Sequence, residues 1–225
     1  MTRRTSRGKC GLCGGTFSKA AMTKHLKSCK QEKGESEKPS GSRSPRKTKS
    51  FHLVVEGRYE PEYWMHLEMP ANAKLEVLDS FLRETWLECC GHLSVFKIEG
   101  QRYSSWPMED FEEKGMNVAL GEVVSPRMRF FHEYDFGTTT ELTLRVVSEG
   151  KSEIKGKSIR LLARNDPPSI TCDSCGKIAT QVCTQCVWSG VGWLCDECAG
   201  EHECDEEMFL PVVNSPRVGM CGYAG

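Results

Sequence analysis

Thirteen cysteines constrain the fold of this 225-residue chain more than any other feature. Three Cys-x-x-Cys pairs fall within 27 residues, and three more candidate ligands follow them: Cys172/Cys175, Cys183/Cys186, Cys195/Cys198, then His202, Cys204 and Cys221. Thiolate is a soft donor that Zn²⁺ prefers, and a Cys-x-x-Cys turn presents two sulfurs to one tetrahedral ion. The C-terminal region is therefore predicted to fold around zinc.

The ligands of this region admit more than one pairing. Two closed sites need eight ligands, and nine candidates are present. We expect an interleaved arrangement, in which Cys172 and Cys175 join Cys195 and Cys198. Cys183 and Cys186 then join two of the last three candidates, which leaves one of His202, Cys204 and Cys221 possibly spare. An iron–sulfur cluster uses the same thiolates, but the mixed histidine favours zinc.

A further ligand set lies near the N-terminus. Cys10, Cys13, His25 and Cys29 have nearly the spacing of a ββα zinc finger with cysteine as its last ligand. Phe17, Met22 and Leu26 supply the small apolar core that such a finger needs. Metal binding would then provide its folding free energy. Together with the C-terminal sites, about three Zn²⁺ ions per chain are expected.

Charge is distributed unevenly along the chain. Residues 1–50 hold fourteen Lys or Arg against three Asp or Glu, a net +11, whereas the remaining 175 residues carry a net −12. A basic arm favours an anionic partner, and nucleic acid is the usual one, although a solvated tail has the same composition. The candidate contacts are basic residues in and around the finger: Arg3, Arg4, Arg7, Lys9, Lys24 and Lys27.

Base reading by this finger would be weak. Its reading positions fall on about Ser18, Ala21 and Lys24, of which only the lysine discriminates well between bases. Non-specific phosphate contact is the stronger expectation. A finger used for protein contact or for stability alone is an equal alternative. The C-terminal region is acidic, and its Trp188 and Trp193 would either contact a protein or pack over a zinc site.

Composition divides the chain into four parts. Residues 1–30 form the finger with its basic arm, and 31–50 lack any aliphatic or aromatic side chain, as expected of a disordered linker. Residues 51–165 form a middle domain, and 166–225 form the C-terminal double-zinc module, with the boundary at the Pro pair near 167–168.

The middle domain is predicted to be α+β with a largely antiparallel sheet. Apolar alternation indicates strands at 51–57, 63–69, 93–98, 101–106, 128–135, 139–149 and 158–164. One main amphipathic helix is expected over 72–89, with Asn72 as its N-cap, because Leu75, Leu78, Leu82 and Trp86 recur at helical spacing. The small zinc-binding modules flank this domain.

Short motifs of the middle domain carry a family resemblance. They are the Pro61…Trp64 segment, the helix through Leu78, the His92–Phe96 block and the Tyr134–Gly137 turn. In their order and spacing the domain resembles the plasmid pRiA open-reading-frame-three-like family, prokaryotic proteins of plasmids, mobile elements and archaeal genomes. Many members continue the turn with acidic residues, a Trp and a His, whereas residues 138–140 are threonines here. The resemblance therefore implies a fold and no reaction.

Other features argue against an enzyme and against a membrane protein. Closed zinc sites leave no position for a catalytic water. Cys89 and Cys90 lie near His92, but they are expected at a helix C-terminus, where the helix dipole opposes thiolate formation, so we interpret them as ordinary thiols. No apolar run approaches the roughly 18 residues of a membrane span, and no signal peptide is recognised, so a cytoplasmic location is expected. The prediction is a zinc-binding, non-enzymatic adaptor associated with nucleic acid. A protein-interaction scaffold is the alternative, and an enzyme using the middle domain ranks third.

Overall fold

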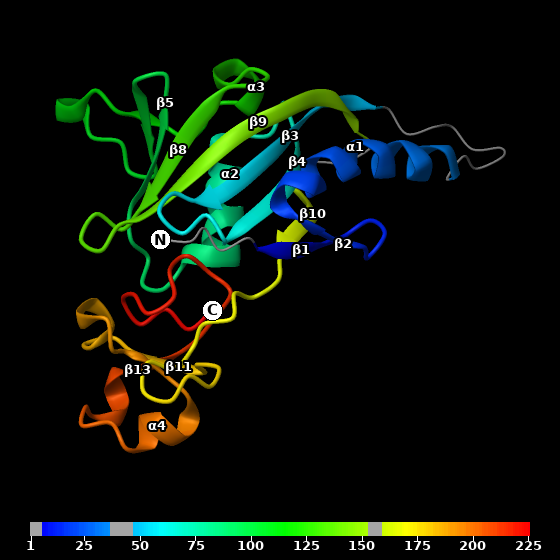
Figure 1. Cartoon of the computed structure of the whole chain (residues 1–225). Coiled ribbons are helices and arrows are strands. Elements are labelled where there is room, and N and C mark those ends of the chain that lie inside the picture. The colour runs from blue at the N-terminus through cyan, green and yellow to red at the C-terminus, as the bar shows by residue number, and fades with distance from the viewer. Residues whose placement is uncertain (1–5, 37–46, 153–158) are drawn as a thin grey trace. The chain divides into compact units, whose positions relative to one another are not determined.

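The computed structural model describes residues 6–36, 47–152 and 159–225 (Figure 1). The chain divides into two compact units. We call the first, built from 1–81 and 93–166, the sheet unit. The second, built from 82–92 and 167–225, is the cysteine-rich unit. No helix among the described residues combines the length and the apolar character that crossing a membrane requires.

The sheet unit contains a ten-stranded sheet of order β2-β1-β10-β4-β3-β9-β8-β5-β6-β7. Its strands are β1 Arg7–Cys10, β2 Thr16–Ser18, β3 Thr48–Gly57, β4 Trp64–Pro70, β5 Ser94–Ile98, β6 Gln101–Ser104, β7 Lys114–Gly115, β8 Arg129–Tyr134, β9 Thr140–Ser152 and β10 Arg160–Asn165. Only the β6–β7 pair is parallel among these described strands. The predicted α+β class with a largely antiparallel sheet is confirmed.

Apolar alternation explains the central strands. Leu142, Leu144 and Val146 of β9 are fully buried, and the residues between them face outward. The neighbouring strand β3 pairs with β9 along its whole length, and the register shifts between His52 and Leu53. Such a bulge re-aims the side chains that follow it. All seven residues of β4 are buried, as expected of a strand covered on both faces.

The described helices are α1 Lys19–Ser36, α2 Leu75–Leu82, α3 Leu120–Val123 and α4 Asp196–Gly200. The helix expected over 72–89 is shorter than predicted. It begins at Leu75, three residues after the expected N-cap, and its C-terminal part is a π-helical turn, Arg83–Leu87. The apolar positions behind the prediction, among them Leu78 and Trp86, are fully buried.

The N-terminal finger is part of the large sheet. Strand β1 pairs with β10 in antiparallel register, with Gly8 opposite Asn165 and Cys10 opposite Ala163. This arrangement differs from the separate N-terminal module expected from composition. The segment expected to be a disordered linker, 31–50, contains regular structure at both ends, because α1 continues to Ser36 and β3 begins at Thr48. Its remaining part, 37–46, lies outside the described residues.

Three of the six histidines are buried in strands of the sheet unit. His52 and His66 share a hydrogen bond of 2.9 Å between their rings, and His132 contacts Asp79 Oδ1 at 2.7 Å. All four side chains are buried. Buried polar groups of this kind need partners to offset their lost hydration. We therefore assign these histidines to the interior of the fold.

The cysteine-rich unit has little regular structure. A three-stranded sheet of order β12-β11-β13 joins β11 Gln181–Cys183, β12 Trp193–Leu194 and β13 Phe209–Pro211. One core cluster of this unit centres on Cys172, Leu194 and Cys195, with Phe209 packed against it. So small an apolar core is insufficient for independent stability, and such units rely on metals or disulfides.

Candidate metal centres

All thirteen cysteines of the sequence belong to four groups, three of which coincide with ligand sets expected from spacing. Within each group the four potential ligand atoms lie within 4.8 Å of one another. A tetrahedral zinc site with Zn–S bonds of about 2.3 Å places its sulfurs ~3.8 Å apart. The four groups can therefore hold metal ions.

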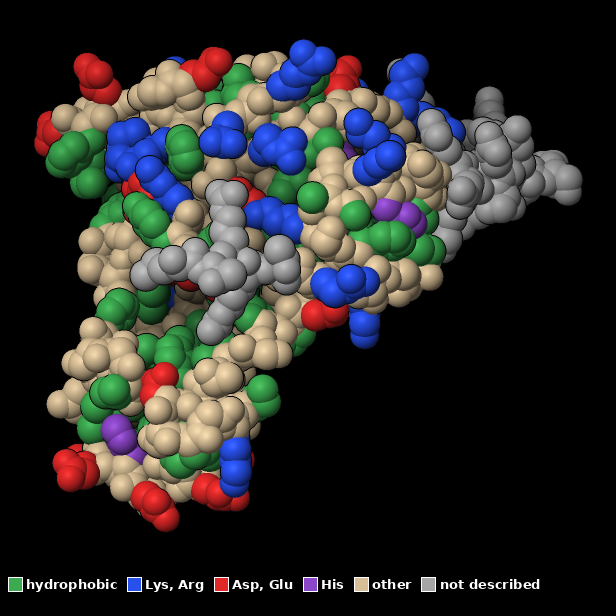
Figure 2. All heavy atoms as spheres, in the orientation of Figure 1, with side chains coloured by type: hydrophobic (Ala, Val, Ile, Leu, Met, Phe, Trp, Pro, Cys, Tyr) green, Lys and Arg blue, Asp and Glu red, His purple; other side chains and the backbone are tan. Residues whose placement is uncertain are grey.

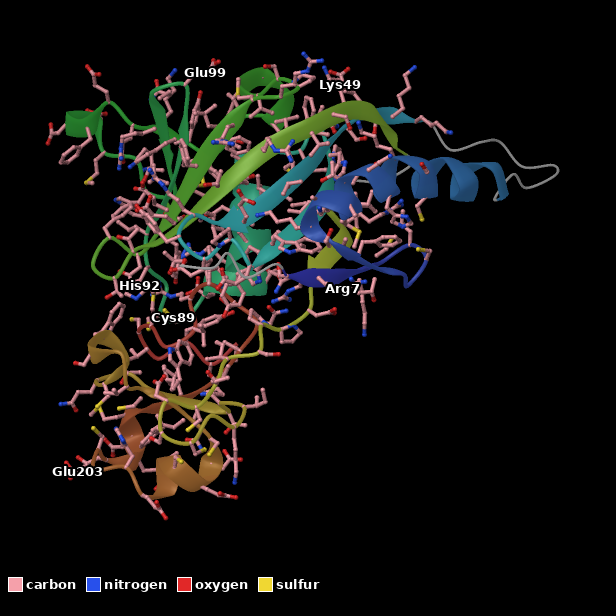
Figure 3. All side chains as sticks on the ribbon, in the orientation of Figure 1. Arg7, Lys49, Cys89, His92, Glu99 and Glu203 are labelled. Carbon is pink, nitrogen blue, oxygen red and sulfur yellow. The ribbon has the colours of Figure 1, made fainter. Side chains whose placement is uncertain are left out.

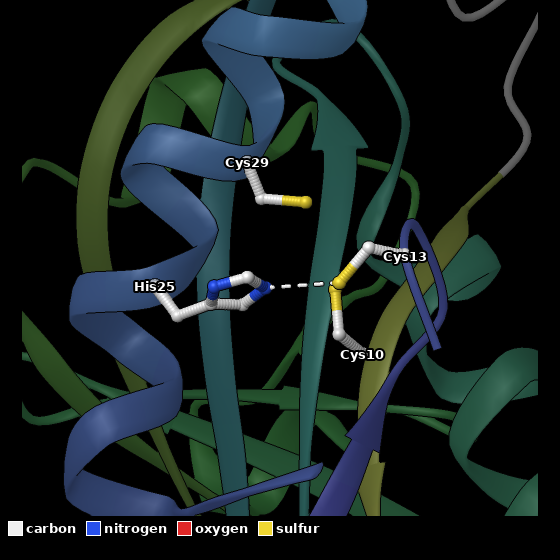
Figure 4. A group of neighbouring side chains, drawn as sticks. All are labelled: Cys10, Cys13, His25 and Cys29. Carbon is white, nitrogen blue, oxygen red and sulfur yellow. Dashed lines mark hydrogen bonds between the residues drawn. The ribbon is translucent and has the colours of Figure 1, made fainter. Parts of the chain in front are cut away.

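The N-terminal centre consists of Cys10, Cys13, His25 and Cys29. Cys10 ends β1 and Cys13 follows in the turn, where Gly14 N donates to Cys10 O at 2.8 Å. The other two ligands lie one helical turn apart on α1, and Figure 4 shows all four side chains converging between turn and helix. Cys13 Sγ is 3.3 Å from His25 Nε2. Phe17 stacks on the imidazole at 3.9 Å and fixes its orientation.

This centre shares its apolar core with the large sheet. Cys10 and Cys29 are buried in one cluster with Met22 and Leu26 of α1 and with residues of the sheet: Trp64, Leu162 and Ala163. The sequence predicts a finger with only a small apolar core of its own. The structure adds residues of β4 and β10 to that core, so packing against the sheet would stabilise the finger together with a bound metal ion.

The basic residues of the finger lie on two different faces. Arg7 and Lys9 alternate along β1 with the buried residues Gly8 and Cys10, so they point away from that core. Lys24 and Lys27 are exposed on α1. Arg3 and Arg4 lie outside the described residues. The four described candidates therefore do not form one patch around the finger.

The expected base-reading positions are only partly available. Ser18 Oγ accepts a hydrogen bond from Ala21 N at 3.4 Å, which makes the serine a cap of α1. The adjacent Lys19 forms a salt bridge with Glu56 and donates to Pro61 O at 3.1 Å. Ala21 and Lys24 are exposed. This leaves Lys24 as the remaining polar side chain for direct readout.

In the cysteine-rich unit, Cys172 and Cys175 meet Cys195 and Cys198, the interleaved grouping expected from the sequence. The first pair lies in a turn closed by Gly176 N donating to Cys172 O at 2.9 Å. The second pair belongs to the start of α4, where Cys195 is the N-cap. Cys175 Sγ and Cys195 Sγ are 3.6 Å apart.

The next centre unites Cys183 and Cys186 with His202 and Cys204. Cys183 ends β11, and Cys186 Sγ is 3.6 Å from Cys204 Sγ. Gly192 lets the chain pass close by, because a Cβ there would lie 2.9 Å from Cys183 O and closer still to Val187 N. Of the three candidates left open by the sequence, Cys221 is absent from this group.

Hydrogen bonds and crowding set the thiol pKa values in opposite directions. Burial opposes ionisation of Cys172, but backbone N–H groups of Cys195, Cys175 and Ser174 lower its pKa to about 6. Hydrogen bonds with Cys175 and Cys195 raise the pKa of Cys198 to about 12. The contact with Cys186 raises the pKa of Cys204 to about 12 in the same way. A divalent cation would replace the protons that these crowded sulfurs share.

Cys221 lies instead with Cys89, Cys90 and His92. Spacing alone does not reveal this group, since Cys89 and Cys90 are adjacent and Cys221 follows 131 residues after Cys90. Two features of the sequence point to this group. The C-terminal region has nine candidate ligands for two sites, so one such as Cys221 is left over, and Cys89 and Cys90 lie near His92. About three ions were expected, and the structure provides four groups.

The Tyr134–Gly137 turn and the two C-terminal tryptophans named from the sequence lie outside the four cysteine groups. Asp135 Oδ1 accepts from Gly137 N at 3.0 Å and from Thr138 N at 3.2 Å, as in a tight turn. The adjacent Tyr134 is fully buried. Of the two tryptophans near the zinc ligands, Trp188 is 68% exposed, whereas Trp193 is half-buried in β12.

Comparison with known proteins adds little to these observations. No protein-family model matches the chain, and no curated protein matches it. Among solved structures the chain is similar to a protein of unknown function from Methanosarcina mazei Go1. That likeness has 16% identity and a TM-score of 0.45, and it covers 52% of this chain and 68% of that one. It supports no inference about function.

Proposed function

We propose that the protein is a zinc-dependent, non-enzymatic adaptor that binds the phosphate backbone of nucleic acid through its sheet unit. The metal of the three groups expected from the sequence is assigned as zinc because they combine three or four thiols with at most one imidazole, a donor set that suits a tetrahedral structural ion. Four protein ligands leave no open position for a water, so we assign the ions to structure.

One hollow of the sheet unit carries the nucleic-acid proposal. It has a volume of about 310 Å³, and its lining includes Lys27 of α1, Lys151 of β9 and the hydroxyl residues Ser50 and Ser148. Both lysines are exposed. Figure 2 shows Lys and Arg side chains gathered over α1, β3 and β9, and Figure 3 marks Lys49 there. Two cations and two hydroxyl groups in one lining suit a phosphate group.

We expect binding without sequence preference, because Lys24 is the remaining base-reading candidate on α1. Glu68, which also lines the hollow, forms a salt bridge with Arg160 at 3.6 Å. Phosphate contacts position a duplex but carry no sequence information. We therefore expect similar affinity for unrelated sequences and a strong dependence on salt.

The test is a salt titration of duplex binding by the full-length chain. Lys27→Ala/Lys151→Ala should weaken binding and reduce the steepness of the log–log salt dependence by roughly 0.9 for each lost phosphate contact. Arg7→Ala/Lys9→Ala tests the opposite face of the finger. Lys177→Ala, which removes an exposed lysine paired with Glu197 in the cysteine-rich unit, is the matched control. Binding that is unchanged in the first double variant contradicts the proposal.

Point variants are preferable to a truncation. Removing the residues before 51 would delete β1, which pairs with β10, and would expose the cluster around Trp64. Loss of binding would then be indistinguishable from loss of folding.

A second candidate function rests on the cysteine-rich unit. Residues 172–225 hold eight Asp or Glu against two Lys or Arg, and Trp188 and Val191 are exposed beside one metal centre. An exposed tryptophan on an acidic surface suits a basic, partly apolar protein segment. Nuclease-treated pull-downs with the full chain and with Trp188→Ala test this scaffold function. Identical recovered partners in both would count against it.

A further inference from the structure

We propose that Cys89, Cys90, His92 and Cys221 bind a fourth zinc ion, which fastens the C-terminal segment of the chain to residues 82–92 within the cysteine-rich unit. His92 Nε2 lies 3.2 Å from Cys221 Sγ, and Cys90 Sγ lies 3.9 Å from the same sulfur. All four ligand atoms lie within 4.8 Å of one another. Figure 3 shows Cys89 and His92 close together.

The donor set matches that of two other centres of the chain. Three thiols and one imidazole also make up the groups at Cys10 and at Cys183. With this fourth centre every cysteine of the sequence has a metal-binding role, and the histidines outside the centres are those buried in the sheet unit. If all four groups bind metal, each of the thirteen cysteines is a ligand and no thiol is left unassigned.

Local backbone geometry brings the ligands into position. Cys221 has a positive φ of 46°, in the left-handed region that L-residues rarely adopt, and Gly219 and Gly222 beside it have φ of 78° and 70°. On the other segment Gly91 has φ of 74° and donates its N–H to Glu88 Oε1 at 2.6 Å. Such a conformation costs a non-glycine residue free energy, and metal ligation by Cys221 would offset that cost.

A buried cation accompanies the centre. Arg217 is fully buried and directs its guanidinium to Cys89 Sγ at 3.3 Å. Zn²⁺ with three thiolates and one neutral imidazole carries one net negative charge, which the guanidinium offsets. The same stretch is held by Ser215, whose hydroxyl donates to Trp86 O at 2.6 Å and accepts from Arg217 N at 2.9 Å. Metal and hydrogen bonds thus join the same two segments.

This centre differs from the others in its accessibility. Each of the other three groups includes at least one buried ligand residue, whereas Cys90 and Cys221 are exposed and Cys89 and His92 are half-buried. A chelator can reach all four ligands of this centre without any opening of the fold, whereas the centres that contain the exposed Cys13 and Cys175 each retain buried ligands. The fourth ion should therefore be the first to leave.

The test counts zinc ions by native mass spectrometry on the full chain. Four ions are expected, against three in Cys90→Ser/Cys221→Ser, because both cysteines serve one centre. Cys204→Ser/Cys221→Ser should hold two, since its substitutions fall in different centres. Four ions in Cys90→Ser/Cys221→Ser, or three in Cys204→Ser/Cys221→Ser, would overturn the assignment.

Kinetics and thiol chemistry provide a second readout. A chelator should remove one ion quickly and the other three slowly, and the fast phase should vanish in Cys90→Ser/Cys221→Ser. In the metal-loaded chain, Cys90 and Cys221 should resist alkylation in spite of their exposure and react once the fast phase is complete. Rapid alkylation of the loaded chain, or a mass two hydrogens lower from a Cys90–Cys221 disulfide, would refute the metal site.

Discussion

Trp64 Nε1 donates a hydrogen bond to Ser6 Oγ over 2.7 Å, and this contact joins the residue before β1 to the middle of the large sheet. Trp64 is fully buried, and its backbone N–H donates to Asn165 Oδ1 at 2.9 Å. One tryptophan therefore connects the N-terminal finger, β4 and β10. The finger is consequently expected to share the stability of the sheet unit.

Ser6→Ala should destabilise the metal-loaded chain by about 1–3 kcal/mol, because it leaves the buried indole N–H without this acceptor. Urea unfolding of the sheet unit measures the change. Ser6→Thr is the matched control, since it retains a hydroxyl at the same position. Equal stability of the alanine and threonine variants would show that the hydrogen bond contributes nothing.

Gly8→Ala should cost about 1–3 kcal/mol through overpacking. A Cβ at this position would lie 2.7 Å from Trp64 Cη2 and closer still to the carbonyl oxygen of Arg164. The backbone of β10 cannot yield as a flexible side chain would. Gly150→Ala in β9 meets no atom within 4 Å and serves as the control in the same thermal or urea measurement. The prediction fails if both variants have the stability of the unaltered chain.

Most of the sheet could be predicted from local pattern, and the attachment of the finger could not. Alternating apolar residues such as Leu142, Leu144 and Val146 mark strands directly, because one face of the sheet is buried. The pairing of Gly8 with Asn165 joins residues 157 positions apart, and no periodicity encodes it. The same holds for the two-residue strand β7, which is too short to show alternation.

The metal centres divide in a similar way. A Cys-x-x-Cys turn places two sulfurs on one ion by local geometry, so the groups of Cys172 and Cys183 could be anticipated from spacing. Adjacent cysteines point in different directions along an extended chain, and Cys89–Cys90 therefore gave no such signal. Their partner Cys221 follows 131 residues after Cys90, and only the tertiary fold brings the two cysteines together.

Glu60→Gln should raise stability slightly near neutral pH, by less than about 0.5 kcal/mol, as is usual for partly exposed sites. Burial raises the pKa of the Glu60 carboxyl above its ordinary value, and the charge of Glu62 adds to this effect. The folded chain then binds more protons than the unfolded chain between the two pKa values, so stability falls as pH rises through that window.

The advantage of Glu60→Gln should accordingly be complete above the raised pKa and absent below the ordinary one. Urea midpoints measured across acidic to neutral pH provide the comparison. Glu62→Gln removes only the neighbouring charge and should give a smaller gain. An advantage of Glu60→Gln that is independent of pH would mean that the carboxyl is not responsible.

Removal of metal should unfold the cysteine-rich unit while most of the large sheet persists. The described strands β11, β12 and β13 have at most three residues, and α4 has five, whereas β9 alone has thirteen. In so small a unit metal binding is folding free energy. Peptide-resolved hydrogen exchange with a chelator should show lost protection across 172–211 and retained protection in β3, β8 and β9.

Acid should also reduce the protection of 172–211, because the Cys and His ligands must be deprotonated to bind metal. Zn²⁺ should restore protection and Mg²⁺ should not, since oxygen ligands suit the harder cation. Protection of 172–211 that survives complete metal removal would show that hydrogen bonds and the small core around Leu194 suffice to hold this unit.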